Sequence, residues 1–501
     1  MNQYYEQLLP YLERNHAYQA ALALFSWDSE TLAPLSAAEQ TATYVGILSE
    51  EAYHVLTCDE IQHLLKKLSS PKEQDSLTVS EKAVVRLLVK EYEKLSCIPA
   101  KEYREFSELC AAAHPIYCRA KQCGTFEDFA PTLEKLIDYT RRFASYRAKK
   151  GEDLYNILLN DYEEGFTTDV LDDFFTKVRD ALVPLIKKVT AKNDTINKDY
   201  NTGYYPPEIQ SGFCRFLAGY LGFDFNKGVI AESEHPFTTS LHNHDVRITN
   251  HFYDDNLESA MFSLIHETGH ALYEMGVEDA ISGTPAGSSM SMGMHESQSR
   301  FYENMIGRSK EFWEPLFPKL KDTYPDELAH VSLDDFIAGI NKAEPGPIRT
   351  EADELTYPLH ILIRYELEKE IFAGNCKVSD LPDLWAKKYE EYLGITPKDA
   401  SEGVLQDIHW AMGNFGYFPS YAIGSAIAAQ LYDYLTGRMP LSDYLKEGNL
   451  VPIREYLRDH IHKYGAVYPT NELLKQVTGE DFNPDYYIRY LTDKYTKLYH
   501  L

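Results

Sequence analysis

The sequence of 501 residues contains no run of apolar residues long enough to span a membrane, although 44% of the chain is apolar. A transmembrane helix needs about 20 consecutive apolar residues. The first residues, MNQYYEQLLPYLERNHAYQ, also lack the basic segment followed by an apolar segment that is typical of a secretory signal. We therefore expect no membrane partner and a cytoplasmic location.

Basic residues are scarce relative to acidic ones. The 49 Lys and Arg residues face 77 Asp and Glu residues, which gives a formal net charge of −28. A surface of this sign repels phosphate backbones, so nucleic acid is not an expected partner. No CxxC pair occurs among the seven cysteines, and this scattered, odd-numbered set favours reduced, mostly buried thiols over a disulfide framework.

No stretch rich in Gly, Ser or Pro reads as a linker between domains. Although a chain of this length would usually hold roughly two to four domains, one large cooperative unit is equally allowed. We predict a single catalytic domain over residues 1–501. Its helical N-terminal part covers about 1–200 and its metal-site part covers about 225–425.

Most of the chain follows the 3.6-residue period of amphipathic helices. An example is SEKAVVRLLVKEYEKL at 80–95, where a Ser precedes an apolar stripe flanked by charges. One exception lies at about 228–253, where β-branched and aromatic residues alternate with polar ones around an Asn-containing turn. The predicted fold class is mainly α, with one small antiparallel β element.

The motif HETGH stands inside the apolar helical pattern MFSLIHETGHALYEMG at 261–276. His266 and His270 are four residues apart, so their imidazoles project from one helix face and can bind the same ion. Glu267 lies beside that face and is predicted to act as the general base. Zinc held by two imidazoles and a carboxylate keeps a position for water, and this arrangement is typical of peptide hydrolysis.

A third ligand is expected from a following helix. The metzincin pattern is excluded, because Tyr273 and Gly276 stand where that class has Gly and His. The segment SMGMHESQSRFYENMIG at 291–307 supplies Glu296, our predicted third ligand, and Glu303, a candidate for holding one of the ligands by a hydrogen bond without binding the metal itself. Glu274, one turn after His270, is expected to orient a histidine or to face solvent.

These residues resemble the carboxypeptidase Taq family of zinc metallocarboxypeptidases. HETGH is followed, 26 residues after its second histidine, by the glutamate of HESQS. Further motifs of that family occur in the same order, namely HPF at 235–237, DVRIT at 245–249, IRTEAD at 348–353 and GVLQDIHW at 403–410. The chain length also matches, so the resemblance extends over the whole chain.

The resemblance implies a nearly all-helical, saddle-shaped single unit with a deep active-site groove. It also implies a homodimer that releases C-terminal amino acids from peptides with broad specificity. The expected cofactor is Zn²⁺, with Co²⁺ or Mn²⁺ as alternatives, because this ligand set does not override the general affinity order of divalent ions. The expected partner is a peptide with a free C-terminus.

The motifs shared with the family also supply substrate-binding candidates. A guanidinium recognises a carboxylate by charge and direction together, so Arg349 or Arg247 is expected to bind the C-terminal carboxylate. Donors for the tetrahedral intermediate are sought among His409, His235 and the tyrosines of NFGYFPSY, Tyr417 and Tyr421. Gln406 is a further substrate-binding candidate, with the alternative that it and Asp407 only hold His409 in place.

Two other functions compete with this interpretation. An endo-acting helical oligopeptidase would use the same metal site without needing a free C-terminus. A non-catalytic helical scaffold would hold a structural metal, but such sites are normally closed by four protein ligands, often cysteines. No cysteine lies near either metal motif in the sequence.

Overall fold

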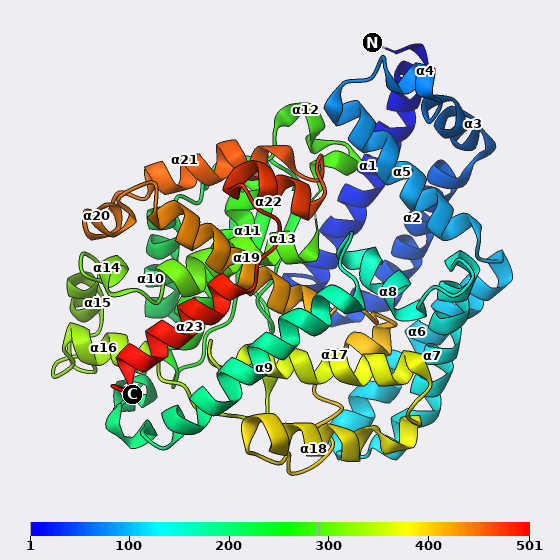
Figure 1. The fold of residues 1–501 in the computed structure, drawn as a ribbon. Helices are drawn as coiled ribbons and strands as arrows, with labels where there is room; N and C mark the ends of the chain where they lie inside the picture. Colours follow the sequence, from blue (N-terminus) through cyan, green and yellow to red (C-terminus); the bar gives the residue numbers. More distant parts are fainter. Residues whose placement is uncertain (1, 289–290) are drawn as a thin grey trace. The chain divides into compact units, whose positions relative to one another are not determined.

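The computed structural model describes residues 2–288 and 291–501, and helices dominate it, as the sequence predicted (Figure 1). The chain forms two compact units, each assembled from three separate stretches. Unit 1 comprises Met1–Ser96, Lys198–Ile337 and Leu431–Asp481, and unit 2 comprises Cys97–Asn197, Ala338–Gln430 and Phe482–Leu501. The single catalytic domain with its two parts, the saddle shape and the groove stay predictions.

Unit 1 carries the small sheet and the helix with the HETGH motif. Its helices are α1 (Gln3–Thr31), α2 (Ala38–Thr57), α3 (Asp59–Leu68), α4 (Pro71–Gln74), α5 (Val79–Ser96), α10 (Pro207–Leu221), α11 (Leu257–Gly276), α12 (Asp279–Ser282), α13 (Met292–Arg300), α14 (Lys310–Trp313), α15 (Phe317–Thr323), most of α16 (Leu333–Ile340), the end of α19 (Pro419–Thr436), α20 (Leu441–Lys446), α21 (Val451–His460) and α22 (Thr470–Thr478).

Helix α11 is buried on nearly every side. Its N-terminus is capped by Asn256, whose side chain accepts a hydrogen bond from the backbone N–H of Ser259 at 3.1 Å. Neighbouring elements α10, α13, α21 and strands β2 and β3 surround it. A helix that is apolar all round belongs in a core, so polar groups on it must find partners inside the protein.

The sheet holds β1 (Gly228–Glu232), β2 (Thr238–His242) and β3 (Asp245–Asn250) in the order β1-β3-β2. The predicted antiparallel pairing is confirmed for β2 with β3, but β1 pairs with β3 in parallel, so the β element is mixed. A Cβ at Gly228 would lie 2.5 Å from the carbonyl oxygen of Val246. Glycine thus lets β1 start close to β3, and alternation of residue types carries no information about strand direction.

Unit 2 is helical throughout its described elements. They are α6 (Ala100–Cys123), α7 (Phe126–Arg147), α8 (Leu154–Tyr162), α9 (Thr168–Thr190), α17 (Tyr357–Ala373), α18 (Leu381–Leu393), the start of α19 (Pro419–Thr436) and α23 (Asp485–Leu498).

Helix α17 is the centre of unit 2 and packs against α8, α9 and α18 (Figure 1). Pro358 stands in its first turn, and Gly374 ends it in the left-handed conformation with φ of 75°. Arg364 and Glu368 lie on this helix and are fully buried. Buried charges need partners, so their contacts indicate which loops the helix holds.

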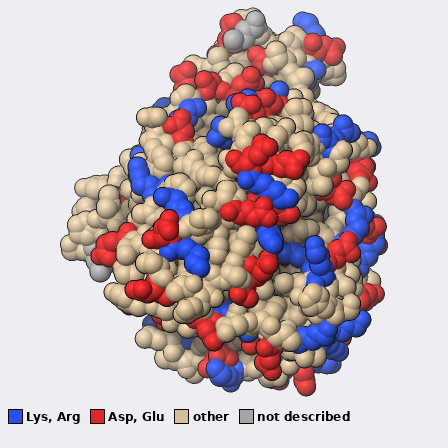
Figure 2. Space-filling model, turned by 90° about the vertical axis from the view of Figure 1, so that its left-hand side faces the viewer, with Lys and Arg blue, Asp and Glu red and all other residues tan. Residues whose placement is uncertain are grey.

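The surface carries charged side chains of both signs. On the face shown in Figure 2, Asp and Glu side chains are spread among Lys and Arg. Among the described residues, no helix is both long and apolar enough to cross a membrane.

Candidate active site

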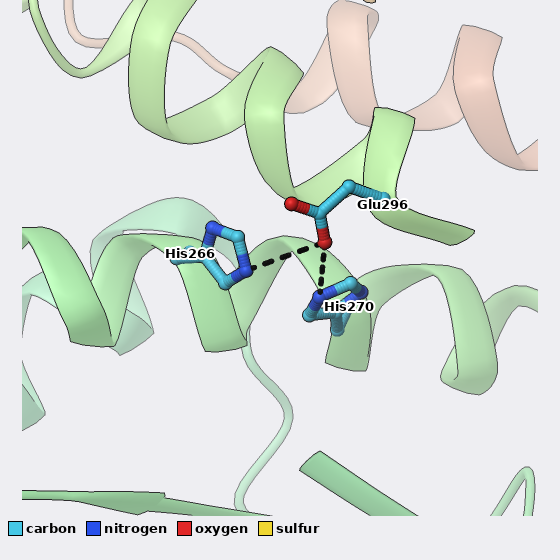
Figure 3. Close-up of side chains that lie close together, drawn as sticks. All are labelled: His266, His270 and Glu296. Carbon is cyan, nitrogen blue, oxygen red and sulfur yellow. Dashed lines mark ion pairs between the residues drawn. The ribbon is translucent and has the colours of Figure 1, made fainter. Parts of the chain in front are cut away.

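His266, His270 and Glu296 come together in unit 1, as Figure 3 shows. Their ligand atoms all lie within 4.8 Å of one another. Oε2 of Glu296 is 3.7 Å from Nε2 of His266 and 3.5 Å from Nε2 of His270. Ligands at about 2.1 Å from a tetrahedral zinc ion are roughly 3.4 Å apart. This spacing therefore fits one metal ion.

The close approach of α11 and α13 places Glu296 beside the two histidines. Gly269, between those histidines in sequence, faces the backbone of α13, where an added Cβ would be 2.7 Å from Cα of Ser299 and 2.8 Å from the carbonyl oxygen of Gln298. Real Cβ atoms essentially never approach backbone so closely. Only a residue without a Cβ at this position lets α13 come close enough to place Glu296 beside the two histidines.

We predict that Gly269→Ala weakens metal binding by about 10- to 100-fold, because α13 must move away and carry Glu296 with it. Zinc affinity measured by competition with a chromophoric chelator tests this. Gly212→Ala is the matched control, since a Cβ on that residue of α10 would meet nothing within 4 Å. The control should keep its affinity and gain slightly in stability. Equal affinities in the two variants would contradict the packing argument.

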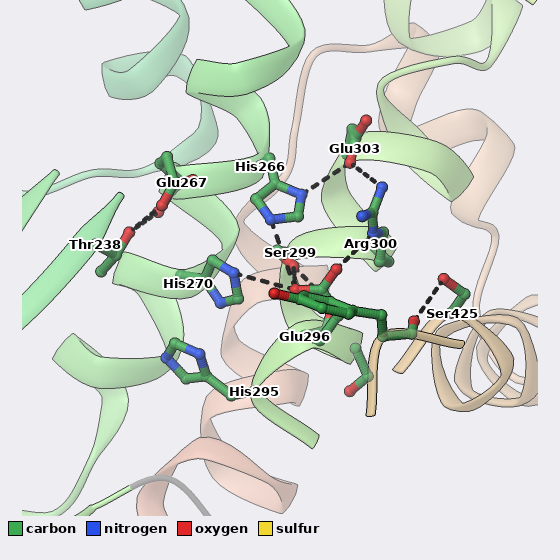
Figure 4. A network of polar contacts seen from close by, with 12 residues as sticks. Thr238, His266, Glu267, His270, His295, Glu296, Ser299, Arg300, Glu303 and Ser425 are labelled. Atoms are coloured by element: carbon green, nitrogen blue, oxygen red, sulfur yellow. Dashed lines mark hydrogen bonds and ion pairs between the residues drawn. The ribbon is translucent and has the colours of Figure 1, made fainter. Parts of the chain in front are cut away.

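The histidine His266 is oriented from behind by a carboxylate. Its Nδ1 lies 2.8 Å from Oε2 of Glu303, so this nitrogen donates and Nε2 is left to face Glu296 (Figure 4). Glu303 stands in a π-helical turn, Phe301–Ile306, that continues α13. Such wide turns are frequent at functional sites.

Arg300 contacts both Glu296 and Glu303. Its Nε donates to Glu296 at 2.7 Å and its Nη1 to Glu303 at 3.1 Å (Figure 4). Burial pushes the pKa of Glu303 upward, but Arg300 and His266 outweigh it and lower that pKa to about 2. The pKa of Glu296 is likewise held below its ordinary value, by Arg300 and the two histidines against the effect of burial. Both carboxylates are therefore ionised at neutral pH.

The second histidine is kept neutral. Burial, with a smaller contribution from His295, lowers the pKa of His270 to about 3, so its nitrogen lone pair is available at neutral pH. The His295 ring stacks on it at a centroid distance of 4.1 Å, and Nε2 of His295 lies 3.0 Å from Oε1 of Glu274. Glu274 thus contacts a histidine, one of the two alternatives that the sequence left open for it.

The electrostatics of this group fit a divalent metal ion. Glu267, Glu296 and Glu303 are three buried carboxylates. The guanidinium groups beside them are those of Arg300 and of Arg308, whose Nη2 is 3.6 Å from Glu303. Although burial disfavours a charged His266, Glu296 and Glu303 raise its pKa above the ordinary value, which shows that the site attracts positive charge at that ring.

Glu267 is buried beside the ligands but is not one of the three. Burial raises its pKa, which favours uptake of a proton by this carboxylate. Its role as general base stays a prediction. Thr238 on β2 donates a hydrogen bond to its Oε2 at 2.6 Å (Figure 4). Sequence analysis missed Thr238, which directly follows the HPF motif.

The remaining candidates of unit 1 lie on or next to the sheet. Arg247 on β3 makes two hydrogen bonds of 2.8 Å to the carboxylate of Asp245, and its guanidinium lies 4.9 Å from the ring centroid of Trp27. His235, in the connection between β1 and β2, has an exposed side chain, and its carbonyl accepts a hydrogen bond from Ser233 at 2.7 Å. Their substrate-binding roles stay predictions.

The other predicted residues form a second group in unit 2. Nε and Nη2 of Arg349 contact Oδ1 of Asp407 at 2.9 and 2.8 Å, and Nε of Arg364 contacts Oδ2 at 2.7 Å. Two guanidinium groups thus share one carboxylate, and the trio has a net charge of +1. The pKa of Asp407 lies well below its ordinary value, because the two arginines outweigh the effect of burial.

Gln406 fastens the loop that carries Arg349. Its Oε1 accepts a hydrogen bond from the backbone N–H of Arg349 at 2.8 Å, and its Nε2 donates to the carbonyl of Pro347 at 3.0 Å. The same amide contacts the hydroxyl of Tyr389 at 3.2 Å. Gln406 therefore holds the Arg349 loop, while its contact with substrate stays a prediction.

His409 and Tyr421 are in contact. Nε2 of His409 lies 3.0 Å from the hydroxyl of Tyr421, and Tyr417 packs against both rings. Burial is the main cause that lowers the pKa of His409 to about 4, and the two arginines add to it against Asp407. A neutral imidazole next to a phenol can donate a hydrogen bond at neutral pH.

A buried HExxH helix with a carboxylate ligand from a following helix defines a metal-dependent peptide hydrolase. The family model described as carboxypeptidase Taq (M32) metallopeptidase matches residues 7–495. The chain therefore belongs to the carboxypeptidase Taq (M32) family, and it is a metallocarboxypeptidase.

Individual relatives agree over their full lengths. The chain is 42% identical to carboxypeptidase 1 of Bacillus subtilis over 497 residues, and 36% identical to thermostable carboxypeptidase 1 of Thermus thermophilus over 507 residues, with 99% of each chain covered in both cases. The crystal structure of the M32 carboxypeptidase from Deinococcus radiodurans R1 superposes with a TM-score of 0.95 at 34% identity, covering 99% of this chain and 100% of that one. The family predicted from the motifs and the mainly α fold predicted from the helical period are thereby confirmed.

Proposed function

We propose that this protein is a zinc-dependent carboxypeptidase that releases C-terminal amino acids from peptides with broad specificity. The observation that carries the proposal is the group His266, His270 and Glu296, of which the last two are buried, with the separate buried carboxylate Glu267 beside it. Broad specificity rests on the family resemblance, as do the homodimer and the choice of zinc over Co²⁺ or Mn²⁺. The cytoplasmic location stays a prediction.

When bound by these three side chains, zinc supplies Lewis acidity, which lowers the pKa of a water molecule and polarises the scissile carbonyl. Glu267 takes a proton from the attacking water while the oxygen of that water bonds to the carbonyl carbon. As the C–N bond breaks, Glu267 returns that proton to the leaving amine. Thr238 holds Oε2 of this carboxylate in place throughout.

The group in unit 2 is proposed to bind the substrate end. Arg349, whose trio with Asp407 and Arg364 has one positive charge in excess, suits the C-terminal carboxylate. His409 and Tyr421 are proposed to donate hydrogen bonds to the tetrahedral intermediate. This assignment leaves Arg247, His235 and Gln406 as further candidates for substrate contact.

The test uses one peptide in two forms, with a free C-terminal carboxylate and with an amide. The protein is first treated with a chelator and then resupplied with Zn²⁺, Co²⁺ or Mn²⁺ separately. We expect activity to vanish and return with metal, single amino acids to appear in order from the free C-terminus, and the amide to resist cleavage. Internal cuts, or equal cleavage of both forms, would instead support the endo-acting oligopeptidase.

A further inference from the structure

Glu368 is a fully buried carboxylate of α17 to which the reaction described above gives no role. Its Oε1 accepts a hydrogen bond from Nε1 of Trp410 at 2.7 Å. Its Oε2 accepts two more, from the backbone N–H of Gly416 at 2.8 Å and from the hydroxyl of Tyr155 at 2.8 Å. Burying a carboxylate is costly unless such donors compensate it, so each of these contacts matters to the local structure.

Two of the three donors belong to the segment that connects His409 with α19. Trp410 is the next residue after His409, and both stand in the short 3-10 helix His409–Met412. Gly416 lies near the other end of the segment in the left-handed conformation with φ of 87°. A Cβ there would be 2.8 Å from the carbonyl carbon of Leu158 in α8, so the backbone is seated directly on that helix.

The third donor makes the anchor rigid. Tyr155 on α8 is itself buried and stacks on Phe372 of α17 at a centroid distance of 5.8 Å. Glu368 thus joins α8, α17 and the segment 409–416 at one point inside unit 2. A segment held at both ends in this way has little freedom to turn the side chains that it carries.

Those side chains are the ones paired as His409 and Tyr421. The imidazole of His409 packs on Phe418 at 4.5 Å between ring centroids and meets the Tyr421 hydroxyl at 3.0 Å. Phe418 directly precedes α19, on which Tyr421 stands. A shift of Trp410 or Gly416 would therefore change the geometry of this pair.

We propose that Glu368 is a positioning residue for the carboxypeptidase reaction. By binding Trp410 and Gly416 near the two ends of the connecting segment, Glu368 sets the orientation of His409 and Tyr421. This inference rests on the proposed role of His409 and Tyr421 toward the tetrahedral intermediate. Hydrogen-bond donors act on a transition state only when they are aimed correctly, and a misplacement of about 1 Å can cost 10²-fold in rate.

A carboxylate suits this position better than the amide of the same shape. The carboxylate offers acceptors on both oxygens, whereas glutamine would turn an NH₂ group toward one of the N–H or O–H donors. Burial raises the pKa of Glu368 to about 7 in spite of these donors and the nearby Arg364. Burial therefore disfavours the charged form, yet an apolar residue at this position would leave the N–H and O–H donors without an acceptor.

The test compares Glu368→Gln, which replaces the carboxylate acceptor, with Trp410→Phe, which removes one of its N–H donors. We expect each to lower kcat by about 10- to 100-fold with KM changed less than about twofold and with bound metal unchanged. Glu366→Gln is the matched control, because Glu366 lies on the same helix but contacts Lys388 and Tyr392 of α18. It should keep the wild-type kcat.

Combination with His409→Ala separates positioning from a general loss of structure. If Glu368 acts through His409 and Tyr421, then Glu368→Gln should lower kcat much less in the His409→Ala background than in the wild-type protein. A full additional loss there, or a wild-type kcat for Glu368→Gln while His409→Ala is impaired, would overturn the positioning role alone. A wild-type kcat for His409→Ala would overturn the proposed role of His409 as well. Should Glu368→Gln not fold, Trp410→Phe in the same two backgrounds decides the question.

Discussion

Replacing Glu267 with glutamine should lower kcat by a factor of about 10² to 10⁴ while the protein keeps its metal. The amide has the same shape but cannot accept a proton from water, so the proton-transfer step alone is removed. The three ligands are separate side chains, and the Thr238 hydroxyl can still donate to the amide oxygen. Turnover of a free-acid peptide, measured together with metal content, gives the result.

Glu296→Ala is the contrasting variant, because it removes a ligand and should lower bound metal itself. A second comparison, Thr238→Val, keeps the base but removes the hydroxyl that orients it, so a smaller loss in kcat is expected. Near-normal turnover of Glu267→Gln with full metal content would show that another group takes the proton. Full metal content in Glu296→Ala would show that the third ligand lies elsewhere.

The sequence alone could predict that the three candidate metal ligands lie together, because their geometry is mostly local. Residues four apart on any helix share a face, so His266 and His270 were certain to lie together once α11 formed. The period of the apolar residues predicted that helix. Glu296 needed more, since a helix and a connection intervene, and its choice depended on the order of motifs as well as on residue type.

Contacts between distant segments could not be read in this way. Thr238 lies 29 residues before Glu267, and nothing in its own neighbourhood indicates that a strand will pass the helix at that point. The role of Gly269 likewise depends on how closely α13 approaches, which only the packed structure shows. The parallel partner of β3 was missed for the same reason, since pairing direction depends on the path of the chain.

The motifs of unit 2 were found by their resemblance to the family, while the contacts of their individual residues came from the structure. The alternative left open for Asp407 and Gln406 was that they only hold His409. In the structure Asp407 contacts the guanidinium of Arg349, and Gln406 contacts its backbone N–H. His409 is instead joined to Tyr421. Neighbouring residues of one motif thus contact different residues, because successive side chains of a short turn point in different directions.

The positive group around Arg349 has a consequence for an acidic enzyme. A net charge of −28, taken as a uniform field, opposes the approach of a C-terminal carboxylate. Binding must therefore come from a cation at short range in a site where water is excluded. Arg349 is buried. Its Nε and Nη2 contact Asp407, and its Nη1 donates a hydrogen bond to the Tyr357 hydroxyl at 3.4 Å. The guanidinium is thus held in one direction, which supports the proposed role of Arg349 in binding the substrate carboxylate.

We expect Arg349→Ala to lower kcat/KM for a free-acid peptide by about 30- to 1,000-fold, equivalent to roughly 2 to 4 kcal/mol of transition-state binding, mainly through KM. The amide of the same peptide lacks the charge and should be hardly affected, so the preference for the free acid collapses. Arg349→Lys keeps the charge without the planar fork and should recover only part of the loss. Arg247→Ala is the comparison from unit 1, where the Arg247 guanidinium already has a carboxylate partner in Asp245. If both alanine variants keep the wild-type preference for the free acid, neither arginine anchors the carboxylate, and the donor must be sought at His409 or a lysine.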